Sequence, residues 1–234
     1  MKNSVKNLVI DDITIQVVRK NIKNINLTVR GPEGMVRMSV PRGVDDHSIN
    51  AFVRAKLSWI KKHKTRLESR EKPPVREYIT GEVHGFLGKM YRLKVIEVSH
   101  QQEQQRVVQQ GECLEIYVQP EHTKEKREAL LYQWYREQLK KLIPHYINKW
   151  EPVMGVKVHQ WGIKRMKTRW GTCNIQAKRI WINLELARKR PECLEYIVVH
   201  ELAHLLERHH NQRFKGLMDQ FLPQWRDFRG ELSG

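Results

Sequence analysis

The first part of the chain alternates apolar and polar residues in short runs, which is the pattern of half-buried β-strands. Residues 13–17 and 25–29 alternate in this way. Gly31 and Gly34 then lead into another apolar run at 35–40. Glycines between two such runs are typical of a turn, so we expect a β-hairpin here.

A long amphipathic helix is expected next. Residues 46–71 carry apolar side chains at helical spacing, and Pro73 and Pro74 end the segment. A second β segment is expected after these prolines, in runs at residues 81–87, 91–98, 105–108 and 114–118.

The pattern changes to helical spacing from residue 123. Its apolar stripe comprises Leu131, Trp134, Tyr135, Leu142, Tyr146 and Trp150. Short strands are expected after this helix, one of them at 179–184. Pro191 suits the first position of another helix, and 214–221 predicts a helix that closes the chain.

The helix expected from Pro191 contains the sequence His200-Glu201-Leu-Ala-His204. On a helix the two histidines lie one turn apart on the same face, where they can hold one zinc ion. Glu201 would then stand beside the metal and accept a proton from water. The neighbouring residues are almost all apolar, so the helix is expected to be buried. Buried imidazoles need partners, and a metal supplies them.

Zinc in a catalytic site takes a third protein ligand and keeps one open position. A straight helix would carry His210 away from the other histidines, so we expect the helix to end near 207 or 208 and the chain to fold back. Asn211 suits the N-cap of the next helix. We favour His210 as the third ligand. The rival candidates are His209, Glu207 and Asp219.

Composition limits the classes of function. The 234 residues include 43 Lys and Arg against 26 Asp and Glu, a net charge of +17, which favours nucleic acid or another polyanion as a partner but equally suits a basic surface without one. No apolar run is long enough to cross a membrane. The N-terminus reads as the start of a strand, not as a signal peptide, and the three scattered cysteines fit a reducing compartment. We therefore expect a cytoplasmic protein.

A second polar constellation precedes the strand expected at 179–184. If the segment is extended, Arg165, Lys167 and Arg169 project from one face and could bind phosphate or a carboxylate of the substrate. The alternative is a basic edge strand that resists aggregation. Trp170 is expected to pack closely, and Asn183 either binds a substrate backbone group or caps the next turn.

Together these segments resemble the YgjP-like metal-dependent hydrolases, which are related to the SprT-like and WLM zinc peptidases. The resemblance rests on the following segments: 169–173 (Arg-Trp-Gly-Thr-Cys), 182–184 (Ile-Asn-Leu), 198–205 (Val-Val-His-Glu-Leu-Ala-His-Leu), the pair His210 and Phe214, and 87–93 (Leu-Gly-Lys-Met-Tyr-Arg-Leu). Thr172 stands where serine is usual, and His209 where asparagine is frequent. The resemblance implies zinc bound by His200, His204 and His210, with Glu201 as the general base.

The expected elements give an α+β fold of two parts: a β-rich N-terminal region with one long helix, residues 1–121, and a minimal zincin-like hydrolase domain, residues 122–234. The resemblance implies a metallopeptidase, and the strand at 179–184 could pair with an extended peptide. Some members of the family are described as pyrophosphatases that convert UTP to UMP and diphosphate. A third hypothesis is a nucleic-acid-associated module whose zinc is structural. The sequence does not indicate the oligomeric state.

Overall fold

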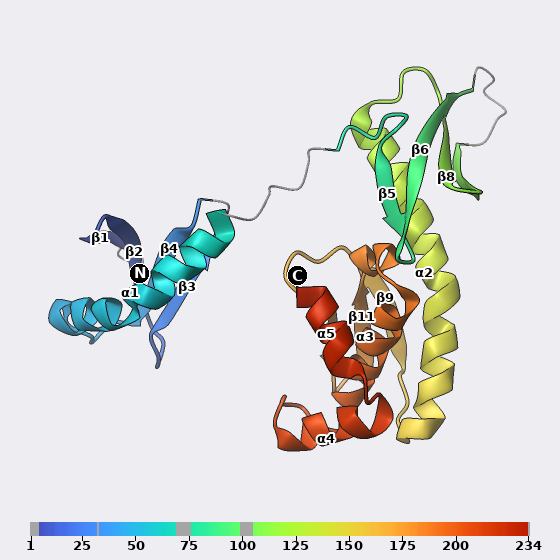
Figure 1. Ribbon diagram of the computed structural model, residues 1–234. Helices are drawn as coiled ribbons and strands as arrows, with labels where there is room; N and C mark the ends of the chain where they lie inside the picture. The colour runs from blue at the N-terminus through green and yellow to red at the C-terminus, as the bar shows by residue number, and fades with distance from the viewer. Residues whose placement is uncertain (1–4, 32, 69–75, 99–104, 234) are drawn as a thin grey trace. The chain divides into compact units, whose positions relative to one another are not determined.

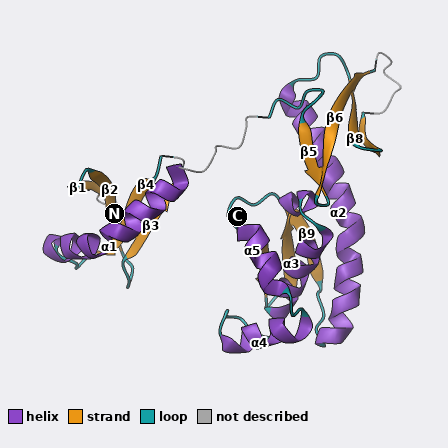
Figure 2. Ribbon diagram, in the orientation of Figure 1, coloured by secondary structure: helices purple, strands orange, loops and turns teal. Residues whose placement is uncertain are grey.

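The computed structural model describes residues 5–31, 33–68, 76–98 and 105–233, and these divide into two compact units, residues 1–75 and 76–234 (Figure 1). The fold is α+β, as predicted, and Figure 2 shows its helices and strands. None of the helices in these ranges is long and apolar enough to span a membrane.

The first unit is a four-stranded sheet covered by one helix. Its strands stand in the order β1-β2-β4-β3, with β2 and β4 parallel and the other pairs antiparallel. The elements are β1 (Val5–Ile10), β2 (Ile13–Lys20), β3 (Asn26–Arg30), β4 (Met35–Pro41) and α1 (Asp46–Glu68). The hairpin predicted around Gly31 and Gly34 is confirmed as β3 and β4. The predicted end of α1, and Pro73 and Pro74, lie outside the described residues.

Alternation along β2 and β4 decides which face of this sheet is buried. Ile15, Val17 and Met38 point to one face and are almost inaccessible. Val53 and Ile60 of α1 cover them and complete a hydrophobic core. The apolar residues of α1 recur at helical spacing, so they lie on the one face of the helix that packs on the sheet. Burial of this face stabilises the helix.

The second unit begins with another sheet and helix. The strands stand in the order β5-β6-β8-β7, again with the two central strands parallel. The elements are β5 (Val83–Phe86), β6 (Lys89–Glu97), β7 (Arg106–Gln110), β8 (Cys113–Val118) and α2 (Lys124–Met154). The helix continues through Pro144 and Pro152 and ends at Gly155, which adopts the left-handed conformation that glycine tolerates.

These two modules, residues 5–68 and 83–154, repeat one topology of four strands and a helix. The central parallel pair also has the same register in both modules. Gln16 pairs with Arg37 and Arg92 pairs with Cys113, and the two partners are equally far apart in the sequence in each case. Equivalent positions are buried in both modules: Ile15 and Tyr91, Val17 and Leu93, Met38 and Leu114, Val40 and Ile116. The repeat is not evident in the sequence, because only the apolar character of these positions is retained.

The rest of the second unit carries a small sheet and the C-terminal helices. The sheet order is β10-β11-β9, with β11 antiparallel to β10 and parallel to β9. The elements are β9 (Gln160–Lys164), β10 (Gly171–Asn174), β11 (Arg179–Asn183), the 3-10 turn η1 (Leu184–Arg188), α3 (Pro191–Ala203), α4 (Gln212–Phe221) and α5 (Trp225–Ser233). The sequence predicted α4 as the closing helix and missed α5.

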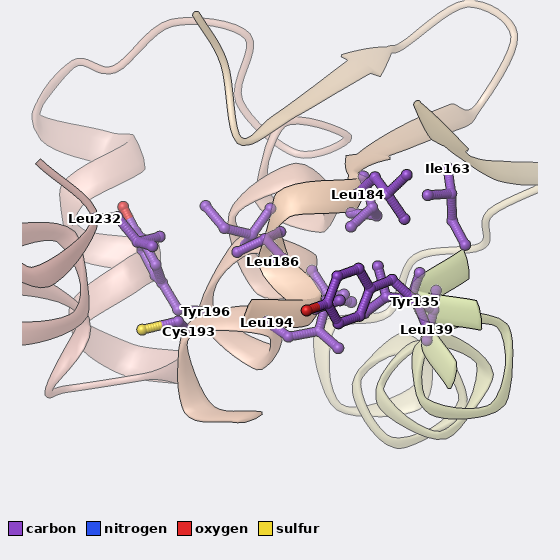
Figure 3. Packing of buried hydrophobic residues seen from close by; sticks show 14 of the residues in the cluster. Tyr135, Leu139, Ile163, Leu184, Leu186, Cys193, Leu194, Tyr196 and Leu232 are labelled. Atoms are coloured by element: carbon purple, nitrogen blue, oxygen red, sulfur yellow. The ribbon is translucent and has the colours of Figure 1, made fainter. Parts of the chain in front are cut away.

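One hydrophobic core joins all parts of the second unit. Leu139 of α2 belongs to the same buried cluster as Ile163, Leu184 and Leu194, which come from β9, η1 and α3 (Figure 3). The Tyr135 hydroxyl of α2 donates a hydrogen bond of 2.8 Å to the Gly85 carbonyl of β5. The boundary expected between residues 121 and 122 therefore falls inside one compact unit, and the division lies between Val75 and Arg76 instead. The second β segment belongs with the C-terminal part because α2 packs against both.

A buried histidine makes the stability of this unit dependent on pH. His84 is inaccessible to solvent; its Nδ1 accepts a hydrogen bond of 2.8 Å from Arg76, and its Nε2 donates one of 3.0 Å to Glu82. Burial, together with the charge of Arg76, lowers the pKa of His84 to about 4. The folded state therefore keeps this ring neutral at pH values where the unfolded chain already binds a proton.

We predict that the free energy of unfolding falls by about 3 kcal/mol between pH 6.5 and pH 4 because of His84 alone. In this range the His84 ring takes up a proton in the unfolded state but not in the folded state. Denaturant unfolding of the metal-free protein and of His84→Gln over this range tests the prediction. The variant should show a shallower decline, whatever its stability at pH 7. Parallel curves for the two proteins would contradict it.

Candidate metal centre

Helix α3 carries the first two histidines through the core of the second unit. Pro191 occupies its first turn, as predicted, and every residue from Tyr196 to Val199 is buried. The helix ends at Ala203, one turn earlier than expected. Leu205 and Leu206 donate hydrogen bonds to the carbonyls three residues before them, which tightens the chain into a turn directly after His204.

The early end of α3 lets the chain return and bring a third imidazole to the first two. One ring nitrogen from each of His200, His204 and His210 lies within 4.8 Å of the others. The Nε2 atoms of His200 and His210 are 3.0 Å apart. The Nδ1 atom of His204 lies 3.1 Å from the Glu207 carbonyl, to which it donates, so its Nε2 keeps a free lone pair.

Phe214 forms the floor on which all three imidazoles pack. Its ring centroid lies 5.0 Å from that of His200, 4.7 Å from that of His204 and 4.8 Å from that of His210. Phe214 is 2 % exposed. The side chain of Asn211 caps α4 as predicted, and accepts a hydrogen bond from the Phe214 amide, which fixes the start of the helix under the rings.

Two buried polar atoms of this site lack hydrogen-bond partners within the described chain. His200 Nδ1 and Glu201 Oε2 are inaccessible and make no hydrogen bond. Burial and the neighbouring His204 lower the pKa of His200 to about 3, and burial likewise lowers the pKa of His204 and His210. Burial raises the pKa of Glu201 to about 8, although the charge of Arg169 acts against this rise.

Three neutral imidazoles beside an unpartnered carboxyl group fit a divalent cation. Each neutral ring offers a lone pair, and a cation would compensate the burial of both the rings and the carboxylate. The nitrogen donor set suits zinc or another transition metal better than magnesium, which prefers oxygen ligands.

The rival third ligands lie elsewhere. The amide of His209 donates to Glu207 Oε1, and the His209 ring is not in the cluster. Asp219 accepts a hydrogen bond of 2.7 Å from the Trp225 indole and pairs with Arg226. Glu207 contributes through its backbone carbonyl, not as a member of the cluster.

The second constellation is only partly at this site. Residues 165–170 are irregular, so the expected alternation of cations does not occur. Arg165 forms ion pairs with Glu128 and Glu185. Neither Arg165 nor Lys167 lines the cavity at the histidines.

Asn183 is buried and holds this irregular segment in place. Its side chain donates to the carbonyls of Met166 and Arg169 and accepts from the amides of Met166 and Glu185. The amide group is fully used, so the capping role holds and substrate binding by Asn183 does not fit. The segment that it holds includes Arg169 and Trp170, which do reach the cavity.

The cavity that contains the histidine cluster has a volume of about 1160 Å³. Strand β10 forms one wall, and its first residue, Gly171, packs directly on the carboxyl group of Glu201. The half-buried thiol of Cys173 also lines it; burial and the charge of Glu201 raise the pKa of Cys173 to about 11. Arg208 and Arg229 complete its cationic lining, and the sequence did not indicate either. Arg229 is carried by α5, whose apolar residues Trp225, Phe228 and Leu232 were the available signal.

Three comparisons with known proteins show what this chain is similar to. A family model for the YgjP-like metallopeptidase domain matches residues 23–234. The comparison with curated proteins gave no match. Among solved structures, the chain is similar to the metallopeptidase zymogen abylysin of Pyrococcus abyssi, with 18 % identity over 40 % of this chain and 90 % of that one and a TM-score of 0.34. It is also similar to the zymogen jannalysin of Methanocaldococcus jannaschii, with 19 % identity over 38 % and 92 % and a TM-score of 0.35.

The family match covers most of both compact units and includes every residue of the histidine cluster, and this family implies a divalent metal and hydrolysis. The chain belongs to the YgjP-like metallopeptidase family.

Proposed function

We propose that this chain is a zinc-dependent peptidase in which His200, His204 and His210 hold the metal and Glu201 is the general base. One observation carries the proposal: three imidazole nitrogens converge beside a buried carboxyl oxygen that has no hydrogen-bond partner among the described residues. A bound zinc ion would polarise the scissile carbonyl and make a water molecule more acidic.

The protein's own contribution is to place a proton acceptor and keep it dry. Glu201 is 3 % exposed, so its carboxylate gains little from solvent and readily takes up a proton. The carboxyl group would take the proton of the attacking water and later donate it to the leaving amine. Phe214 and the Glu207 carbonyl hold the imidazoles in fixed orientations, which removes a reorganisation cost during the reaction.

The substrate would bind as an additional strand. β11, which the sequence favoured for this role, is flanked by β10 and β9 and has no free edge. β10 is an edge strand of this sheet and lines the cavity beside Glu201. An extended peptide that pairs with its outer edge would run past the histidine cluster.

Two features weigh against the alternatives that the sequence left open. Arg165 is paired with acidic residues and Lys167 does not line the cavity, so two of the three cations expected to hold a nucleotide are not at the site. A purely structural metal site does not explain why a buried carboxyl oxygen beside the ligands has no hydrogen-bond partner in the described part of the chain. The experiment that separates peptide from nucleotide hydrolysis also tests the proposal.

Glu201→Gln should keep its bound metal and lose about 100-fold or more of peptide cleavage, because the amide cannot accept the proton of water. Metal-loaded wild type and variant are offered a mixed peptide library and, separately, UTP, with products identified by mass spectrometry and metal content measured in parallel. Equal peptide cleavage by the two proteins would refute the role of Glu201. UMP formation without peptide cleavage would replace the peptidase by a pyrophosphatase.

Phe214→Leu should bind zinc about tenfold or more weakly than wild type, because the three rings lose the flat surface that holds them together. Competition with a chromophoric chelator measures the affinity. Phe221→Leu, at the other end of α4, is the matched control and should bind zinc as wild type does. Equal affinities for all three proteins would contradict this role of Phe214.

Gly171→Ala should lower peptide cleavage about tenfold or more while the metal stays bound. The added methyl group would displace the carboxyl group of Glu201, and a small displacement of a catalytic group slows a reaction strongly. A Cβ atom at Gly171 would lie 2.8 Å from both Cγ and Cδ of Glu201, and the pairing of Gly171 with Ile182 prevents the strand from yielding. Gly216→Ala, where a Cβ meets no atom within 4 Å, is the control and should retain full activity. Unchanged cleavage by Gly171→Ala would show that the carboxyl group is not held by this contact.

A further inference from the structure

The lining of the cavity carries an excess of cations that the proposed reaction does not use. Arg169, Arg208 and Arg229 line it, from the segment before β10, the turn after α3 and helix α5 respectively. The acidic residues of the lining are Glu201 and Glu207. One is the proposed base, and the other accepts the His209 amide and lies 3.9 Å from Arg213.

None of these three arginines has an acidic partner within the part of the chain that the structure describes, whereas nearby arginines do. Arg226, three residues before Arg229 on α5, pairs with Asp219, and Arg190 pairs with Glu231 at 2.7 Å. Within this part of the chain, no acidic side chain therefore competes with a ligand for Arg169, Arg208 and Arg229.

Two of these arginines share the cavity with the proposed metal ligands. Arg169 and Arg229 line the same cavity as the three histidines and Glu201, and their charges give it a positive potential. A bound divalent cation would add to the same positive potential. A guanidinium group recognises a carboxylate through paired hydrogen bonds, so an acidic side chain is the complementary group on a peptide.

The position of Arg169 sets where that acidic side chain lies. Gly171 packs on Glu201, so the reacting bond of a peptide on β10 lies close to this residue. Arg169 is two residues earlier in the chain. Because Arg169 also lines the cavity, a carboxylate that meets it belongs to a residue close to the scissile bond.

On the basis of the proposed peptidase function, we infer that the substrate is an acidic peptide. It carries Asp or Glu close to the scissile bond, and Arg169 and Arg229 are specificity-determining residues that bind this carboxylate. The net positive charge of the cavity then selects substrates, a role separate from the hydrolysis itself.

Two peptide libraries test the inference: one that contains Asp and Glu, and a copy in which they are replaced by Asn and Gln. Wild type should cleave the acidic library with a kcat/KM about tenfold or more above that of the amide copy, the scale expected for a charge-assisted pair. Arg169→Gln and Arg229→Gln should each reduce this ratio, and the double variant should bring it close to one. Arg226→Gln, on the same helix but paired outside the cavity, is the control and should retain the wild-type ratio.

A binding measurement keeps this test separate from that of the peptidase function. Metal-loaded Glu201→Gln is titrated with a matched Glu and Gln peptide pair and with UTP, at low salt and at about 0.5 M salt, which screens charges. Tighter binding of the acidic peptide, weakened by salt and by Arg229→Gln, supports the inference even if no cleavage is found. Equal affinity for both peptides, or binding of UTP alone, would overturn it. Undiminished cleavage by Glu201→Gln would refute the proposed base. The ratio of the affinities for the Glu and Gln peptides would still decide whether the cavity selects acidic peptides.

Discussion

Helix α3 places two imidazoles and a carboxyl group in a core that offers them few hydrogen-bond partners. Desolvation of these groups is the constraint on which the site depends. It keeps His200 neutral and holds the pKa of Glu201 near 8. The same burial would be destabilising without a compensating ligand, since unpaired polar groups in a core cost free energy. Neighbouring residues fix the positions of these buried groups. Phe214 packs against the rings, the Glu207 carbonyl orients the His204 ring, and Gly171 leaves room for the carboxyl group of Glu201.

Local patterns were sufficient to predict the elements that carry the histidines. Pro191 and Asn211 mark the starts of α3 and α4, because capping depends on neighbouring residues alone. The pattern His-Glu-x-x-His also depends on helical spacing alone. The preference for His210 over His209 rested on spacing and resemblance, and the structure brings His210 to the other two rings.

Long-range pairing was not accessible from the sequence. The order of the strands in the small sheet decides which strand lies at its edge, and the local sequence pattern does not reveal this order. The pattern therefore favours β11 for pairing with a peptide, although β11 lies in the centre of the sheet. The run of Arg165, Lys167 and Arg169 looked like one face of a strand. Buried Asn183 instead holds the backbone of this segment in an irregular conformation. Its side chain donates hydrogen bonds to the Met166 and Arg169 carbonyls, which are distant from Asn183 in the sequence. Arg229 was missed because α5 is short and its position beside the cavity follows from packing on α3.

The repeated module has a consequence for how the chain is synthesised. Residues 5–68 form their sheet and core without a contribution from the residues of the histidine cluster. Domains generally fold as units during translation, with the N-terminal one first. The first module can therefore be complete before the ribosome has made His200, His204 or His210, so its folding does not wait for the histidine cluster.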